Sequence, residues 1–359
     1  MDSNIDYKYI SNAIDELISL LGIKEEIPTD TIFKPFRAGN IKACIENIAN
    51  WLGLPILVNL SYVPAHYQTR NAGIRFESSA LSTTDDAGRG AEGISAQVLI
   101  PSNLPFYGSS GLNGFPINVK VSSNYKRYPD TFMLIMAHEL SHIVLHSLWH
   151  GEKNNEIYTD LTTMILGFSS VMENGRKVVE TREKFMSTET LTTTYGYLSD
   201  ENFDYAFDRI GQIRQKNIDL KERLFNKVAT YRKQLSSYKK EFFKFREFIE
   251  YLDKNHTKRI RGKDGAKIVD CHQLDYTNRF LVVIRSNEGK LKEINDFYVG
   301  LVHYTKTRLN SLRKFNGEID TLITELKKEL GVLKKDVGTL GKYVSFIYKL
   351  KTNRQASKN

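Results

Sequence analysis

The stretch TFMLIMAHELSHIVLHSLWH, at residues 131–150, constrains this chain more than any other part of it. These twenty residues contain no glycine or proline, the two residue types that most often interrupt a helix. Asp130 stands immediately before the stretch and is a residue type that caps helix N-termini. The pattern therefore predicts one continuous helix of about five turns, apolar enough to lie in a core.

Histidines recur at every fourth position of this helix, at His138, His142, His146 and His150. Residues four apart on a helix share a face and lie about 6 Å apart along the axis. His138 and His142 can therefore direct their imidazoles at a single ion. Glu139 lies next to that face and can take a proton from water without binding the ion. This HExxH arrangement is that of zinc peptidases, in which the glutamate is the general base.

The other two histidines do not supply the third ligand. His146 lies about 12 Å along the axis from His138, too far to share an ion that is bound at about 2.0–2.1 Å. Leu148 stands at the position where the metzincin pattern requires a histidine. We expect His146 and His150 to be satisfied side chains of the core, with a contact to substrate as the alternative.

A second helix, EIYTDLTTMILGF, is predicted after the turn that follows the histidine helix, with Asn154 or Asn155 as its N-cap. If this helix returns antiparallel, Glu156 reaches the ion as the third ligand. Asp160, four residues later, then reaches the far nitrogen of one ligating imidazole and fixes its orientation. Three protein ligands leave one position open, as a catalytic Zn²⁺ site requires.

The combination of HExxH with ExxxD is similar to that of the gluzincin class of zinc metallopeptidases. DTFMLIMAHELSHIVLH…NEIYTDLTTMILGF resembles in particular the bacterial ImmA/IrrE-like regulatory peptidases. The resemblance covers roughly residues 38–210 and implies a zincin-like domain that hydrolyses a protein substrate in a regulatory role. Gluzincins often stabilise the oxyanion with a tyrosine or histidine. Tyr195 and Tyr197 are candidates for that part, with ordinary packing as the alternative.

Helices and short strand-like runs alternate before residue 210, which predicts an α+β fold with a small sheet and an active-site helix. We expect an N-terminal helical segment at 1–37 and a zincin-like metallopeptidase domain at 38–210. The polar, threonine-rich stretch at 169–199 is expected to be a loop or lid over the cleft, or an ordinary connector.

Charge divides the chain near residue 211. Residues 211–359 carry 34 Lys and Arg against 17 Asp and Glu, whereas residues 1–210 carry 17 against 25. Apolar residues in the basic half alternate spacings of three and four, which predicts a long helical hairpin, coiled coil or bundle. The run RFLVVIRS at 279–286 fits either a strand or a buried helix. Two series of apolar residues form this seam: Val228, Tyr231, Leu235, Tyr238, Phe242, Phe245, Ile249 and Leu252, then Phe315, Ile319, Leu322, Leu326, Leu333, Val337, Leu340, Val344 and Ile347.

The basic character of the second half has more than one explanation. A solvated helical face is commonly lysine-rich, but the same charges would also bind nucleic acid phosphates, an acidic partner protein or the acidic half of the chain. The alternative function is therefore a helical nucleic-acid- or protein-binding module with a structural or inactive zinc site. Glu139 argues against it, because a structural site needs a fourth protein ligand and no general base.

Cysteine usage and hydropathy indicate the compartment. The only two cysteines, Cys44 and Cys271, allow neither a disulfide framework nor a thiolate zinc cluster. No apolar run approaches the roughly 18 residues that span a bilayer, and the first residues lack the pattern of a signal peptide. We expect a cytoplasmic protein without a membrane partner, whose metal is held by histidine and carboxylate.

Overall fold

The chain divides into two compact units. The structure, a computed structural model, describes residues 6–64, 96–184, 187–256 and 276–356. Unit 1 comprises Met1–Lys216 and Val302–Lys306, and unit 2 comprises Asn217–Leu301 and Thr307–Asn359. The division thus falls after Lys216, inside a helix, rather than before residue 211 as charge alone suggests. Unit 1 also includes a short segment of the basic half, Val302–Lys306.

Unit 1 is α+β, with small sheets among many helices. Its helical elements are α1 (Tyr7–Leu21), α2 (Thr29–Arg37), α3 (Ile41–Leu52), the 3₁₀ turn η1 (Ser110–Leu112), α4 (Pro129–Ser147), α5 (Glu156–Thr163), the π-helical turn η2 (Met164–Phe168), α6 (Ser169–Gly175) and the start of α7 (Asp200–His256). Its strands are β1 (Ile23–Lys24), β2 (Leu57–Val63), β3 (Ala96–Leu99), β4 (Pro116–Ser122), β5 (Lys177–Lys184), β6 (Ser187–Thr194) and β7 (His303–Tyr304).

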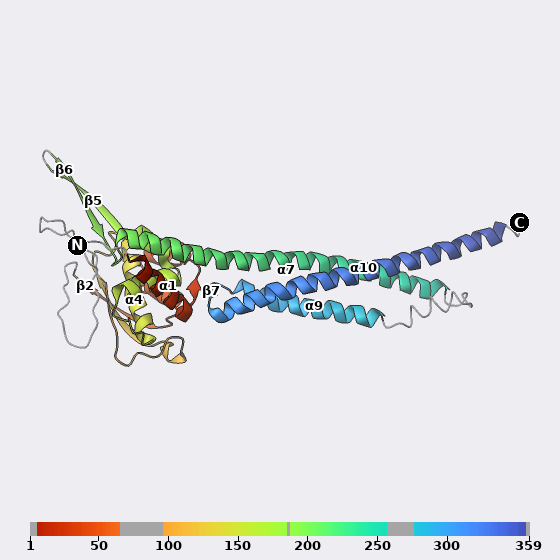
Figure 1. Cartoon of the computed structure of the whole chain (residues 1–359), viewed down its shortest axis with the longest axis horizontal. Helices are drawn as coiled ribbons and strands as arrows, with labels where there is room; N and C mark the ends of the chain where they lie inside the picture. The colour runs from red at the N-terminus through yellow and green to blue at the C-terminus, as the bar shows by residue number, and fades with distance from the viewer. Residues whose placement is uncertain (1–5, 65–95, 185–186, 257–275, 357–359) are drawn as a thin grey trace. The chain divides into compact units, whose positions relative to one another are not determined.

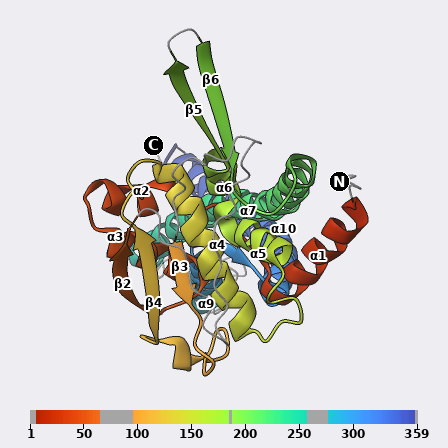
Figure 2. The ribbon, with the colours of Figure 1, turned by 90° about the vertical axis from the view of Figure 1, so that its left-hand side faces the viewer.

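The largest sheet of the described residues has three strands in the order β2-β4-β3. β4 pairs in parallel with β2, from Leu57 opposite Pro116, and antiparallel with β3, from Ala96 opposite Val121. Alternate residues of the central strand, Ile117, Val119 and Val121, are fully buried, as expected of a strand with one face on a core. Figure 2 shows this sheet beside α4, which contacts β3, α3, α5 and α6.

α4 is the predicted histidine helix, and it is buried on all sides. Every residue from Thr131 to Leu145 is buried. The helix begins at Pro129, whose missing N–H costs nothing in the first turn, and the residue before it, Tyr128, makes no side-chain capping bond. Asp130, expected as the cap, lies instead in the first turn, where its charge suits the helix dipole.

The helix after the turn is shorter than predicted. α5 ends at Thr163, and the π-helical turn that follows breaks at Gly167, where φ is 96°. A side chain there would collide with the Glu25 carbonyl oxygen, and the Gly167 carbonyl accepts the N–H of Ile27 at 2.8 Å. Only glycine fits so close to this neighbouring segment.

The stretch 169–199 is not the loop expected from its composition. It forms α6 and then a β5–β6 hairpin, in which Lys177 pairs with Thr194 and Lys184 with Ser187. Valine and threonine are frequent in this stretch and favour extended backbone. The threonine-rich composition therefore corresponds to a pair of strands and not to an irregular loop.

β7 joins unit 1 from far along the chain. It pairs antiparallel with β1, Tyr304 opposite Ile23, and the Tyr304 hydroxyl donates to Glu25 Oε1 at 2.5 Å. At Gly22, where φ is 76°, an added Cβ would lie 2.8 Å from the Tyr304 carbonyl oxygen. The backbone of β1 and β7 can approach this closely because Gly22 has no side chain.

The start of α7 is fixed to the same region by Arg214, whose side chain is 8% exposed. Its Nε donates to the carbonyl oxygen of Lys24 at 2.8 Å, and a terminal nitrogen donates to that of Met164 at 2.7 Å. The guanidinium also pairs with Glu26. Arg214 thus ties α7 to β1 and to the turn that follows α5.

Unit 2 consists, in its described part, of three long helices: the remainder of α7, which Figure 1 shows as one unbroken helix, α9 (Tyr276–Val299) and nearly all of α10 (Lys306–Ala356). The ambiguous run at 279–286 is helical and belongs to α9. Across the described helices, none combines the length and apolar character needed to cross a bilayer.

The predicted seam is buried in unit 2 wherever its side chains are described, apart from two half-buried positions, Phe315 and Leu322. Phe280 of α9 packs against Tyr238 and Phe242 of α7, with ring centroids 5.9 and 5.7 Å apart. The buried members are Val228, Tyr231, Leu235, Tyr238, Phe242, Phe245, Ile319, Leu326 and Leu333. The side chains of the other predicted members, Ile249, Leu252, Val337, Leu340, Val344 and Ile347, lie outside the described part.

Candidate metal centre

Two imidazoles from α4 form one side of the candidate site. His138 and His142 lie four residues apart in the buried part of the helix, with ring centroids 4.9 Å apart and planes at 86°. Their side chains are only 6% and 1% exposed. The helix thus places two imidazoles next to each other, as its periodicity predicted.

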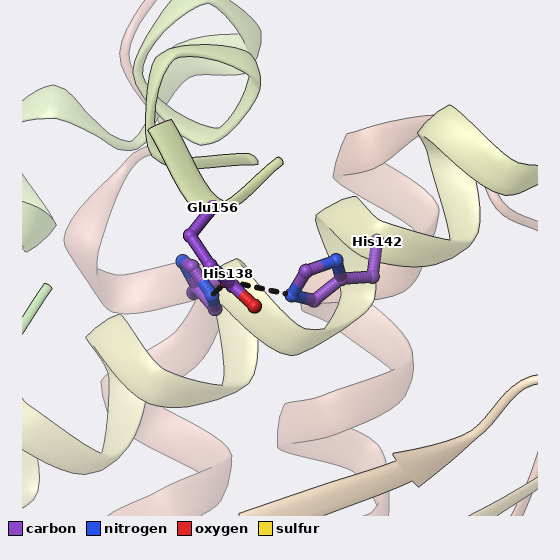
Figure 3. Close-up of side chains that lie close together, drawn as sticks. All are labelled: His138, His142 and Glu156. Carbon is purple, nitrogen blue, oxygen red and sulfur yellow. Dashed lines mark hydrogen bonds and ion pairs between the residues drawn. The ribbon is translucent and has the colours of Figure 1, made fainter. Parts of the chain in front are cut away.

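α5 brings a carboxylate to both rings. Glu156 is the first residue of α5, which begins there because the side chain of the preceding Asn155 accepts the N–H of Ile157 at 3.1 Å. Glu156 Oε2 lies 3.1 Å from Nε2 of His138 and 3.2 Å from Nε2 of His142 (Figure 3). The three residues offer ligand atoms that all lie within 4.8 Å of one another.

The two distances between histidine and glutamate suit a tetrahedral metal ion. Two ligand atoms bound tetrahedrally at 2.0–2.1 Å lie about 3.3–3.4 Å apart, and the His–Glu distances of 3.1 and 3.2 Å are close to that value. Two imidazole nitrogens and one carboxylate oxygen are also a ligand set that zinc accepts. Glu156 is the most exposed of the three, at 23%, so the site opens toward solvent on its side.

The outer nitrogen of His138 is held by Asp160. Asp160 Oδ1 lies 2.8 Å from Nδ1 of His138. Its other oxygen accepts the backbone N–H groups of Tyr197 and Leu198 at 2.7 and 3.2 Å. Gly196, which precedes these two residues, has a φ of 98°, and an added Cβ would lie 3.4 Å from Asp160 Oδ2. One fully buried carboxylate therefore joins the imidazole to the backbone before α7.

The electrostatics of the site favour a cation. Burial lowers the pKa of His138, but hydrogen bonds to Asp160 and Glu156 and the nearby charge of Glu139 outweigh it and raise the pKa to about 10. Burial raises the pKa of Glu156, but the hydrogen bonds from both histidines lower it to about 2. Burial, the largest cause, lowers the pKa of His142. Without a metal, a proton on His138 is thus stabilised by the surrounding carboxylates.

The remaining residues of the histidine helix are placed as follows. Glu139 is buried, and its charge helps to raise the pKa of His138. Burial, together with Lys153 and His142, lowers the pKa of His146 to about 4. His150 Nε2 lies 3.3 Å from Glu16 of α1. The histidines excluded by helix geometry are accordingly not part of the cluster of possible metal ligands.

The structure distinguishes the two tyrosines. The ring of Tyr197 stacks on His138, with centroids 5.5 Å apart and planes at 23°. Tyr195 is buried, and its N–H donates to the carbonyl oxygen of Arg176 at 2.8 Å. Tyr197 therefore borders the candidate site.

Two further residues shape the site and were not singled out from the sequence. Thr159 Oγ1 lies 3.2 Å from Nδ1 of His142. Its position three residues after Glu156, on the same helical face, is a signal that could have pointed to it. Arg176 donates to the carbonyl oxygen of Leu198 and to Asp200, and so holds the segment that Asp160 also binds. Nothing in the local sequence marks that role.

No protein-family model, curated protein or solved structure matches the chain. The functional argument therefore depends on the residues of the site and their chemistry.

Proposed function

We propose that this chain is a zinc-dependent peptidase of the gluzincin type, with a zincin-like fold in unit 1. The observation that carries the proposal is the meeting of His138 Nε2 and His142 Nε2 at one carboxylate oxygen of Glu156, at 3.1 and 3.2 Å. Glu139, next to the first histidine, supplies the acid–base group that hydrolysis requires. The ligands and the base come from α4 and α5, and the HExxH and ExxxD motifs account for all of them.

In this proposal each residue of the site has a distinct role. His138, His142 and Glu156 would hold the zinc ion, and Asp160 would keep the first imidazole in orientation. A zinc ion at this place supplies Lewis acidity, which polarises a carbonyl group and acidifies water. Glu139 takes the proton from the attacking water and delivers it to the leaving amine. Tyr197, which borders the site, is placed better than Tyr195 to contact the oxyanion.

A structural zinc site is the competing interpretation. It would need a fourth protein ligand. In the described residues the cluster around these histidines has three members, and both oxygens of a further carboxylate, Asp160, are engaged by His138 and backbone N–H groups. A three-ligand set with a neighbouring glutamate favours catalysis over a closed structural site.

The substrate class and setting complete the proposal. We infer a protein or peptide substrate and a regulatory role from the resemblance to the ImmA/IrrE-like peptidases. The scarcity of cysteine suits a reducing compartment such as the cytoplasm. The basic helices of unit 2 are the part of the chain that would bind a partner protein or nucleic acid. The alternative is that these charges form a lysine-rich face that only contacts solvent.

Metal analysis combined with a proteolysis assay tests the proposal. The purified protein should contain one zinc per chain, and His142→Ala should lose it. Glu139→Gln keeps the size of the side chain but removes the base, so hydrolysis should fall by at least about a hundredfold while zinc is retained. A Glu139→Gln protein that cleaves as fast as the parent would exclude Glu139 as the base. Full zinc occupancy in His142→Ala would exclude the ligand assignment.

A further inference from the structure

The two imidazoles of the site have different outer partners. Nδ1 of His138 faces the carboxylate of Asp160, whereas Nδ1 of His142 lies 3.2 Å from the hydroxyl oxygen of Thr159. Both Thr159 and His142 are almost completely buried, so water does not readily replace this contact. A charged acceptor orients one ring, and a neutral hydroxyl lies at the corresponding nitrogen of the other.

The hydroxyl of Thr159 has a backbone acceptor besides the imidazole. Thr159 Oγ1 lies 3.2 Å from the backbone carbonyl oxygen of Asn155, which can only accept a hydrogen bond. If the hydroxyl donates to Asn155, its lone pair faces the imidazole. The hydroxyl oxygen can then accept a hydrogen bond from a proton that His142 carries on Nδ1, and in this tautomer Nε2, 3.2 Å from Glu156, offers its lone pair to a metal ion that Glu156 shares. Because a metal ion needs the lone pair of Nε2, only the tautomer with the proton on Nδ1 suits a metal-loaded site.

We propose that Thr159 is a positioning residue for His142, which holds the imidazole as its Nδ1–H tautomer and presents Nε2 to a metal ion. The inference rests on the proposed function, since it assumes that His142 is a ligand. It goes beyond that function by assigning a role to Thr159, which occupies a variable position of the ExxxD motif. The contact also fixes the rotation of the ring, because an imidazole whose outer nitrogen is bonded cannot turn without losing that bond.

Zinc affinity in three variants tests the proposal. Thr159→Val keeps the shape of the side chain and removes the hydroxyl, so we expect zinc to bind about tenfold more weakly in competition with a chromophoric chelator. Thr159→Ser restores the hydroxyl and should bind within about threefold of the parent. Thr163→Val is the matched control, because Thr163 is buried one turn later and its hydroxyl contacts Ser141 and the Thr159 carbonyl oxygen instead of an imidazole.

Nitrogen-15 NMR of the zinc-loaded protein supplies a readout that a packing role would not change. The parent and Thr159→Ser should show the proton of His142 on Nδ1, with a sharp, slowly exchanging signal. Thr159→Val should lose that protection from exchange. Thermal unfolding of the metal-free proteins shows whether Thr159→Val and Thr163→Val cost similar stability.

The outcomes separate this inference from the proposed function. If the parent binds zinc and Thr159→Val binds it equally well, the inference is wrong and the metal site stands. If Thr159→Ser is as weak as Thr159→Val, the methyl group or the packing matters, and the hydroxyl does not. A parent that binds zinc but hydrolyses no peptide would overturn the peptidase while leaving this positioning role. A parent that binds no zinc would overturn both.

Discussion

The interiors of unit 1 and unit 2 are held together by different interactions. In unit 1, charged side chains such as Arg214 and Asp160 are buried, and each makes several hydrogen bonds to backbone groups or other charges. In unit 2, the interior is an aromatic and aliphatic seam, in which Phe280 packs against Tyr238 and Phe242. Directional bonds fix positions, whereas apolar packing tolerates changes of similar volume. We therefore expect changes to buried groups to lower the free energy of unfolding more in unit 1 than in unit 2.

The largest expected effect comes from cutting the chain. A fragment of residues 1–210 lacks Arg214 and β7, so the carbonyl oxygens of Lys24 and Met164 and the edge of β1 lose their partners. We expect it neither to melt cooperatively nor to bind zinc. A second chain, in which a glycine–serine linker replaces Asn217–Leu301 and which ends at Lys306, should melt cooperatively and bind zinc.

Circular dichroism melting and zinc stoichiometry of the two shortened chains check this prediction. The linked chain is the control for the loss of unit 2. If residues 1–210 alone melt cooperatively and hold one zinc, the division found in the structure has no thermodynamic meaning, and the boundary indicated by charge is the better one.

The next largest effect concerns a single buried cation. Arg214→Met should lower the free energy of unfolding by about 3–5 kcal/mol, because it leaves Glu26 and two carbonyl oxygens without their partner. Arg209→Met is the matched control in the same helix, since its partner Asp15 is 60% exposed and such pairs contribute about 0–1 kcal/mol. Urea unfolding measures both. Equal losses would contradict the contrast between buried and exposed pairs.

Acid sensitivity should trace partly to His146. Burial, Lys153 and His142 lower its pKa to about 4, against about 6.5 in an unfolded chain. Below pH 6.5 the unfolded state therefore takes up a proton that the folded state excludes, and stability falls until about pH 4, at most by about 1.4 kcal/mol per pH unit. His146→Gln should flatten this part of the profile. Urea unfolding of the metal-free protein between pH 4.5 and 7 checks it, and identical profiles would show that His146 is not responsible.

The smallest effect distinguishes two buried tyrosines. Within the described residues the hydroxyl of Tyr231 in unit 2 has no hydrogen-bond partner, and burial together with Glu325 raises its pKa to about 12. Tyr231→Phe should therefore change stability by less than about 1 kcal/mol or improve it. Tyr304→Phe in unit 1 removes a bond to Glu25 and should cost about 1–3 kcal/mol. If the two substitutions cost the same, the units do not differ as described.

Local periodicity explains what the sequence could predict. The separation of His138 and His142 is fixed by helix geometry, and a short turn then suffices to bring Glu156 and Asp160 back. The same geometry placed His146 outside the cluster, as the structure has it. The seam of unit 2 could likewise be predicted, because its apolar residues recur three and four positions apart. The metal itself, and the reaction, remain predictions.

Long-range contacts explain what the sequence could not predict. Arg214 finds its partners at Lys24 and Met164, and Asp160 binds the backbone at Tyr197, which no spacing rule connects. A strand of two residues such as β7 has no periodicity to detect. The threonine-rich stretch at 169–199 has a composition that loops and strands share.

The late position of β7 also affects the order of synthesis. A ribosome adds about 5–20 residues per second, so Asn217–Leu301 takes roughly 4–17 s to make. During that time the edge of β1 is open, because β7 has not yet been translated, and an open strand edge can pair with another chain. Unit 1 can close only after most of two helices of unit 2 have emerged. A nascent chain paused within α9 would thus have every proposed zinc ligand outside the ribosome but an incomplete fold, and it would need protection from aggregation until residue 304 follows.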